Sequence, residues 1–390
     1  MGKYVYVGLA AIVLAFLLSP REPYAKTTST YFPAHAPLEP TPPSSIWVDG
    51  QYLFGRYKHG IPDIAFHSEN HEEIAQAIAH LPSRFQTKYW HFTSFNTREF
   101  FVGFALVQLQ YVSDVFLYII DKNTLEKFEF NHRLPGTIGV SFALSSVDNS
   151  TCSIYQDVNQ IEACFIGDAW HIKASVPVTS SQTHQEHKLE FDVKLNRDEA
   201  LTLLYPLADD PLRPAYVHKG AGSQATGTLQ FKNDHFTLEN ALGAIDWTKS
   251  MALRETIWNW ASTSYHINDT AIGINLSQHV YDVDGASQEN AIWINGTVCA
   301  LGGVHFHVPD DKSGVWTIES LNSTEVYLEF TPAGVRYEDN GVPYIAQSKF
   351  FQPYGTFDGR ISCVLEGSDT AYEFQVKNAF GIVENHFALW

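Results

Sequence analysis

The residues best suited to chemistry lie together in one short stretch, residues 243–262, which reads GAIDWTKSMALRETIWNWAS. It combines Asp246 and Arg254 with three tryptophans, Trp247, Trp258 and Trp260. A carboxylate beside a large apolar ring loses hydration, which raises its pKa and makes it a better proton donor. We therefore expect a site wall here, with Asp246 as the candidate acid and Arg254 beside it. A purely structural pair of Asp246 and Arg254 under a tryptophan is the alternative.

Other residues in the second half of the chain could contact the same ligand. Trp258 and Trp260 would share one face of a strand, where they either line an apolar pocket or fill a barrel core. Asn275 lies in the motif GINLS, and Glu289 and Asn290 open the motif ENAIWING. Residues at the mouth of a barrel often meet ligand, so these three are candidate ligand-binding residues. A role in turn formation is the alternative for Asn290.

The last ten residues, GIVENHFALW, contain a second candidate pair. Glu384 and His386 would share one strand face, as an acid–base pair requires, and a surface pair is the alternative. His305 and His307 also alternate, but the sequence offers no third metal ligand at a suitable spacing and no HExxH motif, so no metal is predicted. It has no P-loop, no glycine-rich dinucleotide motif and no GxSxG, so no cofactor is predicted either.

Composition and pattern predict the fold that must position these residues. A chain of 390 residues is too long for one ordinary core, and its 14% aromatic content favours strands. Apolar and polar residues alternate through most of the chain, as in KLEFDVKL at 188–195, which is typical of antiparallel sandwiches and barrels. We expect an all-β protein with helices only at 68–81 and 197–204. The glycine-rich segment 219–227 is the expected connection between β domains at 47–218 and 219–390.

The N-terminal segment indicates a membrane attachment. Residues 1–19 hold Lys3 followed by an uncharged run from Tyr4 to Leu18, which predicts a single-pass anchor, with a cleaved signal peptide as the alternative. The short segment before the run would stay inside, so the body would face the outer side. Residues 20–46 form a proline-rich linker. The formal net charge of −18 argues against nucleic acid as a partner.

The four cysteines leave two interpretations open. Cys152 and Cys164 lie in neighbouring strand-like segments and could cross-link a hairpin in an oxidising compartment. Four free, buried thiols, with Cys299 and Cys363 included, are the alternative.

Several motifs, taken in order, resemble a known family. AIDWTKS, RETIWNWAS, GINLS, ENAIWING, SKFFQPYGTFDG and GIVENHFALW resemble the domain-of-unknown-function family 2804 over roughly residues 47–390. That family is distantly similar to the carotenoid 1,2-hydratase, AttH-like and tocopherol cyclase group of calycin proteins. The shared elements are an Asp–Trp pair, here Asp246 and Trp247, and a Tyr–Trp pair, here Tyr89 and Trp90.

The resemblance implies two tandem lipocalin-like antiparallel barrels or bent sheets. In the wider group an acid protonates an isoprenoid alkene, which would make Asp246 the proton donor. The faces of Trp90, Trp247, Trp258 and Trp260 would then stabilise the resulting cation.

The predicted function is therefore binding of a hydrophobic small molecule, a lipid or isoprenoid, in a β-barrel cavity of a membrane-anchored protein. An enzyme for acid-catalysed hydration, cyclisation or isomerisation of such a ligand is the alternative, and a structural envelope protein is the third possibility. A tryptophan-rich stretch with no cavity beside it would argue against the first two.

Overall fold

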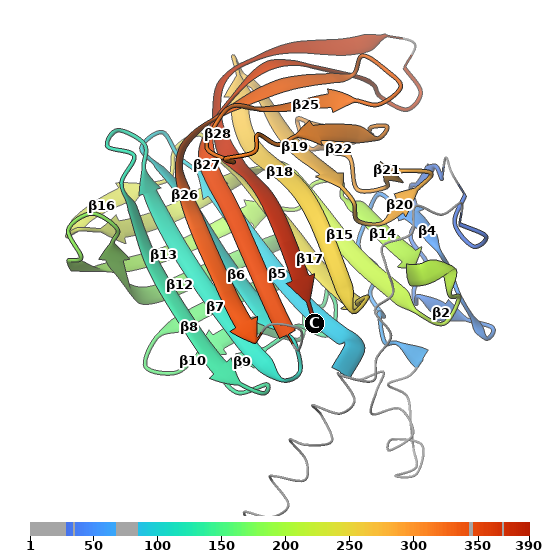
Figure 1. Cartoon of the computed structure of the whole chain (residues 1–390), viewed down its shortest axis with the longest axis horizontal. Helices are drawn as coiled ribbons and strands as arrows, with labels where there is room; N and C mark the ends of the chain where they lie inside the picture. The colour runs from blue at the N-terminus through green and yellow to red at the C-terminus, as the bar shows by residue number, and fades with distance from the viewer. Residues whose placement is uncertain (1–28, 34–35, 68–84, 343–345, 369) are drawn as a thin grey trace, which may run out of the picture.

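The computed structural model of the protein describes residues 29–33, 36–67, 85–342, 346–368 and 370–390. Within these ranges the chain is all-β, as its alternating pattern predicts, and its sheets are strongly curved (Figure 1). No helix among the described residues is both long enough and apolar enough to cross a membrane. The predicted anchor at residues 1–19 and the predicted helix at residues 68–81 lie outside the described ranges.

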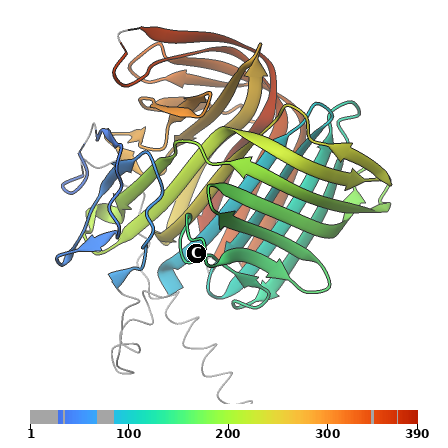
Figure 2. The same ribbon diagram turned by 180° about the vertical axis from the view of Figure 1, so that it is seen from behind.

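The larger sheet closes on itself. In the described chain, pairing runs from β5 through β6, β7, β8, β12, β13, β15 and β17 and returns to β5. In Figure 2 the green and yellow-green strands of this ring lie in front of its blue-green strands, with orange strands of the second sheet behind them. The sheet contains β1 (Leu38–Glu39), β4 (Gly55–Tyr57), β5 (Thr87–Asn96), β6 (Phe100–Gln108), β7 (Val112–Asp121), β8 (Lys127–Pro135), β9 (Val140–Ser141), β10 (Cys152–Gln156), β11 (Gln160–Ile166), β12 (Ala169–Ser180), β13 (Glu186–Asn196), β14 (Leu201–Pro206), β15 (Pro214–Phe231), β16 (Asp234–Thr237) and β17 (Ala241–Met251).

The second sheet is formed by the C-terminal part of the chain, and in Figure 1 its strands β26, β27 and β28 lie in front of the blue-green strands of the larger sheet. It contains β18 (Glu255–Ile267), β19 (Thr270–Gln278), β22 (Ala291–Ile294), β23 (Thr297–Ala300), β24 (Val304–His307), β25 (Trp316–Ser320), β26 (Val326–Val342), β27 (Ala346–Val364) and β28 (Ala371–Leu389). Outside the two sheets are the hairpins of β2 (Trp47–Val48) with β3 (Gln51–Tyr52) and of β20 (Asp282–Val283) with β21 (Ala286–Ser287), and the 3₁₀ turn Leu207–Asp209.

The packing of the two sheets explains why some strands do not alternate. Every residue of β6 except Gln108 is buried. Phe104 and Leu106 pack in the interior of the ring, whereas Phe101 faces the second sheet and lies 5.8 Å from the ring of Phe380. A strand covered on both faces has a nearly continuous apolar sequence, here FFVGFALVQ.

Three predicted segments differ from the structure. The described part of the predicted linker at residues 20–46 packs onto the body of the protein, since β1 pairs with β4 and both Phe32 and Ile46 are buried in core clusters. Residues 219–227 are not a connection but lie inside β15, where a β-bulge between Ala221 and Ser223 accommodates Gly222 at a φ of +73°. Residues 201–204 of the second predicted helix belong to β14, which is fully buried between β4 and β15, so tertiary pairing outweighs helix propensity. The chain leaves the larger sheet at Met251, the last residue of β17, and enters the second sheet at Glu255, the first residue of β18. The domain boundary between residues 218 and 219 stays a prediction.

The backbones of the two sheets come into close contact where β15 meets β19. A side chain at Gly273 would overlap the backbone of Ala221 and Gly222. We expect Gly273→Ala to lower the free energy of unfolding by about 1–3 kcal/mol, because no flexible side chain can move aside. Gly220→Ala is the matched control on β15, since a side chain there would meet no atom within 4 Å. Urea unfolding of both variants measures the difference, and equal stability of the two would contradict the close approach.

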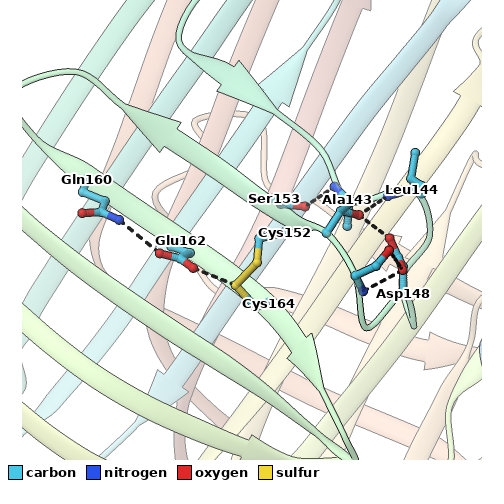
Figure 3. The surroundings of a disulfide bond; sticks show 10 residues. Ala143, Leu144, Asp148, Cys152, Ser153, Gln160, Glu162 and Cys164 are labelled. Carbon is cyan, nitrogen blue, oxygen red and sulfur yellow. Dashed lines mark hydrogen bonds between the residues drawn. A yellow bond between two sulfur atoms is a disulfide. The ribbon is translucent and has the colours of Figure 1, made fainter.

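All four cysteines are paired in the structure. Cys152 and Cys164 are directly opposite each other on β10 and β11, with their Cα atoms 4.4 Å apart, and form a disulfide bond (Figure 3). Cys299 on β23 and Cys363 on β27 form the second disulfide, in the core of the second sheet. The interpretation with a cross-linked hairpin is therefore the one that the structure adopts.

Candidate functional site

A cavity of about 250 Å³ lies between the two sheets, beside the tryptophan-rich stretch. Its walls come mainly from β5 and β17 of the larger sheet, from β18 of the second sheet, from the 3₁₀ turn Leu207–Asp209 and from residues 279–282. Strands β15, β19 and β28 contribute one residue each. Ligand pockets in proteins are typically concave and largely apolar, with a few convergent polar groups. The aromatic part of the wall consists of Trp90, Phe92, Tyr205, Trp258, Trp260, Tyr281 and Trp390.

Strand alternation decides which residues reach the cavity. Along β5, Lys88, Trp90 and Phe92 face it, and along β17 so do Asp246 and Thr248. Phe92 is paired with Asp246, and Trp90 with Thr248, so the two strands form one continuous wall. Successive side chains of a strand point to opposite faces, so the intervening residues face the interior of the ring.

This alternation corrects the prediction for Trp247. The side chain is fully buried in the core of the ring, where it packs against Tyr89 and Tyr216, and it does not line the cavity. The expected contact between Asp246 and the ring of Trp247 does not occur, because neighbours on a strand point apart. Trp90, Trp258 and Trp260 line the cavity. For Trp258 and Trp260, whose spacing leaves a pocket and a core both open, the structure adopts the pocket, and Trp90 is the residue expected there from the family resemblance.

The positive partner of Asp246 is Lys219, not Arg254. The Lys219 ammonium group donates a hydrogen bond to Asp246 Oδ2 and lies 3.4 Å from Glu289 Oε1. Its side chain is only 5% exposed. Burial lowers the pKa of Lys219, but Asp246 and Glu289 more than offset this and raise it above its usual value. Burial also raises the pKa of Glu289, while Lys219 opposes that rise.

Glu384 is the buried acid of the cavity. Trp258 Nε1 donates to its Oε2 at 2.8 Å, and Gln352 Nε2 donates to its Oε1 at 2.6 Å. Burial raises the pKa of Glu384 to about 7, although both hydrogen bonds favour the ionised form. Near neutral pH this carboxyl group can therefore both hold and release a proton, which is the property expected of a general acid.

His386 and Arg254 are buried near the cavity but do not line it. His386 packs beneath Trp258, with ring centroids 4.0 Å apart, and its Nε2 is 2.9 Å from Ser348 Oγ. Burial lowers the pKa of His386 to about 3, so the imidazole is neutral at pH 7. Arg254 donates to the backbone carbonyl oxygen of Trp390. Of the expected acid–base pair, only Glu384 lines the cavity, while His386 lies behind the cavity wall.

Asn275 and Asn290 support the cavity wall from behind. Trp260 Nε1 donates to Asn275 Oδ1 at 2.8 Å, and Asn275 Nδ2 donates to the backbone oxygen of Glu289 at 2.8 Å. Asn290 Oδ1 accepts from the backbone nitrogen of Ser277 at 2.6 Å. Both amides are buried and neither lines the cavity, so Asn275 orients Trp260 and the backbone at Glu289, while Asn290 holds the backbone of Ser277.

The two alternating histidines pack against each other, with ring centroids 4.4 Å apart, and each also contacts a different polar partner. His305 Nδ1 is 2.8 Å from Gln278 Nε2, and His307 Nε2 is 2.7 Å from Glu319 Oε1. Within the described residues, the group spaced for a metal ion is Cys152, Glu162 and Cys164, whose two cysteines form a disulfide.

The sequence model of the family described as "Domain of unknown function (DUF2804)" matches residues 55–390. No curated protein sequence matches the chain. Among solved structures, an AttH-like protein from Nitrosomonas europaea is 10% identical over 83% of this chain and 96% of that protein, with a TM-score of 0.41. Kievitone hydratase from Nectria haematococca is 9% identical over 78% of this chain and 88% of that protein, with a TM-score of 0.40.

Proposed function

The chain belongs to the DUF2804 family, as its ordered motifs predict, and from that premise we propose that it binds a hydrophobic small molecule between its two sheets. The observation that carries this proposal is the cavity bordered by Trp90, Trp258 and Trp260, with Asp246 and Glu384 among its polar groups. Drug-sized ligands occupy pockets of about 300–1,000 Å³. A cavity of about 250 Å³ favours a ring compound, or one end of a longer lipid or isoprenoid, over a whole long-chain molecule.

Filling the cavity tests this function. We expect Ala252→Trp, on the cavity wall, to weaken binding of the neutral dye N-phenyl-1-naphthylamine about tenfold, or about 1.4 kcal/mol. Ala371→Trp, at an exposed position of β28, is the matched control and should leave the affinity unchanged. Dye fluorescence measures both, and native mass spectrometry identifies any lipid that copurifies. No dye binding and no copurifying lipid would favour the structural envelope role instead.

A second candidate function is acid catalysis on the same ligand, and the position of Glu384 favours it. Its carboxyl group would add a proton to an alkene carbon, and the oxygen of water or of a ligand hydroxyl would bond to the carbocation. The proton that this oxygen then loses would return to the Glu384 carboxylate. Trp90 and Trp258 would stabilise the positive charge through their ring faces. In this scheme Glu384, not Asp246, donates the proton, because Asp246 is already paired with Lys219.

The finer architecture and the location belong to the same proposal. We propose two lipocalin-like barrels, and the closed ring of paired strands supports the first of them. We also propose that the body lies on the outer side of a membrane and is held there by residues 1–19. Two disulfides support an oxidising compartment. Thiol alkylation of protein taken from its native host, with and without prior reduction, tests this placement, and four reactive thiols before reduction would contradict it.

A further inference from the structure

The charged groups around the cavity indicate the charge of its ligand. We propose that the ligand is an organic cation, an amine or quaternary ammonium group on an apolar body, and this inference rests on the proposed binding function. Two features carry it: the arrangement of the aromatic rings and the excess of carboxylates around them.

Four of the cavity rings form two perpendicular pairs. The rings of Trp90 and Trp258 are 6.2 Å apart at 88°, and those of Phe92 and Trp260 are 5.4 Å apart at 86°. An alkylammonium group is attracted to the negative face of an aromatic ring, and Trp is the strongest such partner. Perpendicular rings present faces from more than one side, as the aromatic cages that bind methylated ammonium groups do.

One of these rings already lies near a cation of the protein. The Lys219 ammonium group lies 5.4 Å from the ring centroid of Trp260. Within the described residues, no lysine or arginine lies over Trp90 or Trp258, although both line the cavity. A ligand cation would therefore take the faces of Trp90 and Trp258. There it would lie beside Glu384, which accepts a hydrogen bond from Trp258 Nε1.

The carboxylates of the cavity outnumber its positively charged groups, and this excess negative charge would attract an organic cation. Lys219 offsets only one of its two carboxylate partners, Asp246 and Glu289, and ionised Glu384 adds a further negative charge. Lys88, a second lysine of the cavity wall, donates hydrogen bonds to the backbone oxygens of Phe85 and Leu109 and not to any described carboxylate of the cavity. The titratable groups of the wall are the acids Asp209, Asp246, Glu255, Asp282, Glu289 and Glu384, the bases Lys88, Lys219 and His279, and the phenols of Tyr205 and Tyr281.

Two probes of the same shape test the inference. Benzyltrimethylammonium carries a positive charge, and neopentylbenzene is its neutral isostere. Displacement of N-phenyl-1-naphthylamine at pH 8 should show the ammonium probe binding roughly tenfold more tightly than the isostere. The preference should shrink at pH 6, where Glu384 holds its proton beside Asp246 and Lys219, and His386 stays neutral.

Two variants test whether Glu384 causes the preference for the ammonium probe. Glu384→Gln should abolish most of the preference for the ammonium probe while leaving the affinity for neopentylbenzene intact, which also reports that the cavity is folded. Glu319→Gln, at an exposed carboxylate bonded to His307, should leave both affinities unchanged. Equal affinity of the two wild-type probes would overturn the cation inference but leave the binding function standing. Failure of the dye and both probes to bind would overturn both.

Discussion

Lys219→Met is expected to lower the free energy of unfolding by about 3–5 kcal/mol, the largest loss among the variants considered. The substitution leaves Asp246 and Glu289 buried without their shared ammonium partner. Removing one member of a buried ion pair is costly because the remaining charge has neither water nor a partner. Urea unfolding at pH 7.5 measures the loss.

The ion pairs make two further predictions for the same variant. At pH 5 the loss should be smaller, because burial raises the pKa of Glu289 and Lys219 no longer opposes that rise in the variant. Lys219→Met combined with Asp246→Asn should recover part of the stability, since one uncompensated charge is removed with it. A loss below about 1 kcal/mol in the single variant would show that the pairs are screened as surface ion pairs are.

Lys219 also illustrates what the sequence could not reveal about the site. It lies in KGAGSQATG, whose glycines and small polar residues suggest a loop, yet the segment is the centre of β15. Its partners Asp246 and Glu289 are distant in the sequence and meet only through the pairing of β15 with β17 and the packing of the second sheet. The spacing of residues within one segment cannot predict a contact between side chains from three distant segments.

The alternation of residues along the sequence predicted side-chain orientation correctly where a single strand determines it. The spacing of Trp258 and Trp260 places both on one strand face, which meets the cavity, and the alternation of KLEFDVKL matches β13. The same rule, applied to Asp246 and Trp247, would have put their side chains on opposite faces. The error there lay in treating sequence neighbours as spatial neighbours. For Glu384 and His386 the shared face was inferred correctly, but Trp258 covers the imidazole, and only packing determines that.

The second large effect is the dependence of stability on pH that Glu384 confers. The pKa of this carboxyl group is about 7 in the folded protein. In an unfolded chain the pKa of a glutamate is about 4.3. The folded state therefore binds the proton more tightly, so the stabilising contribution is complete below pH 4 and is lost as pH rises through 7. The pKa difference corresponds to about 3 kcal/mol of stability lost from the wild type between pH 4 and pH 8.

Glu384→Gln should remove this dependence, because an amide does not titrate. Trp258 Nε1 can still donate to the amide oxygen, and a half-turn of the Gln352 amide would let its Oε1, which has no hydrogen-bond partner, accept from the new NH₂ group. Relative to the wild type, the variant should therefore gain about 3 kcal/mol on going from pH 4 to pH 8.5. Urea unfolding at both pH values measures the gain, with Glu319→Gln as the exposed control. Parallel stability profiles for wild type and Glu384→Gln would mean that folding does not raise the pKa of Glu384. The group would then be ionised near pH 7, which would also remove its role as the proton donor.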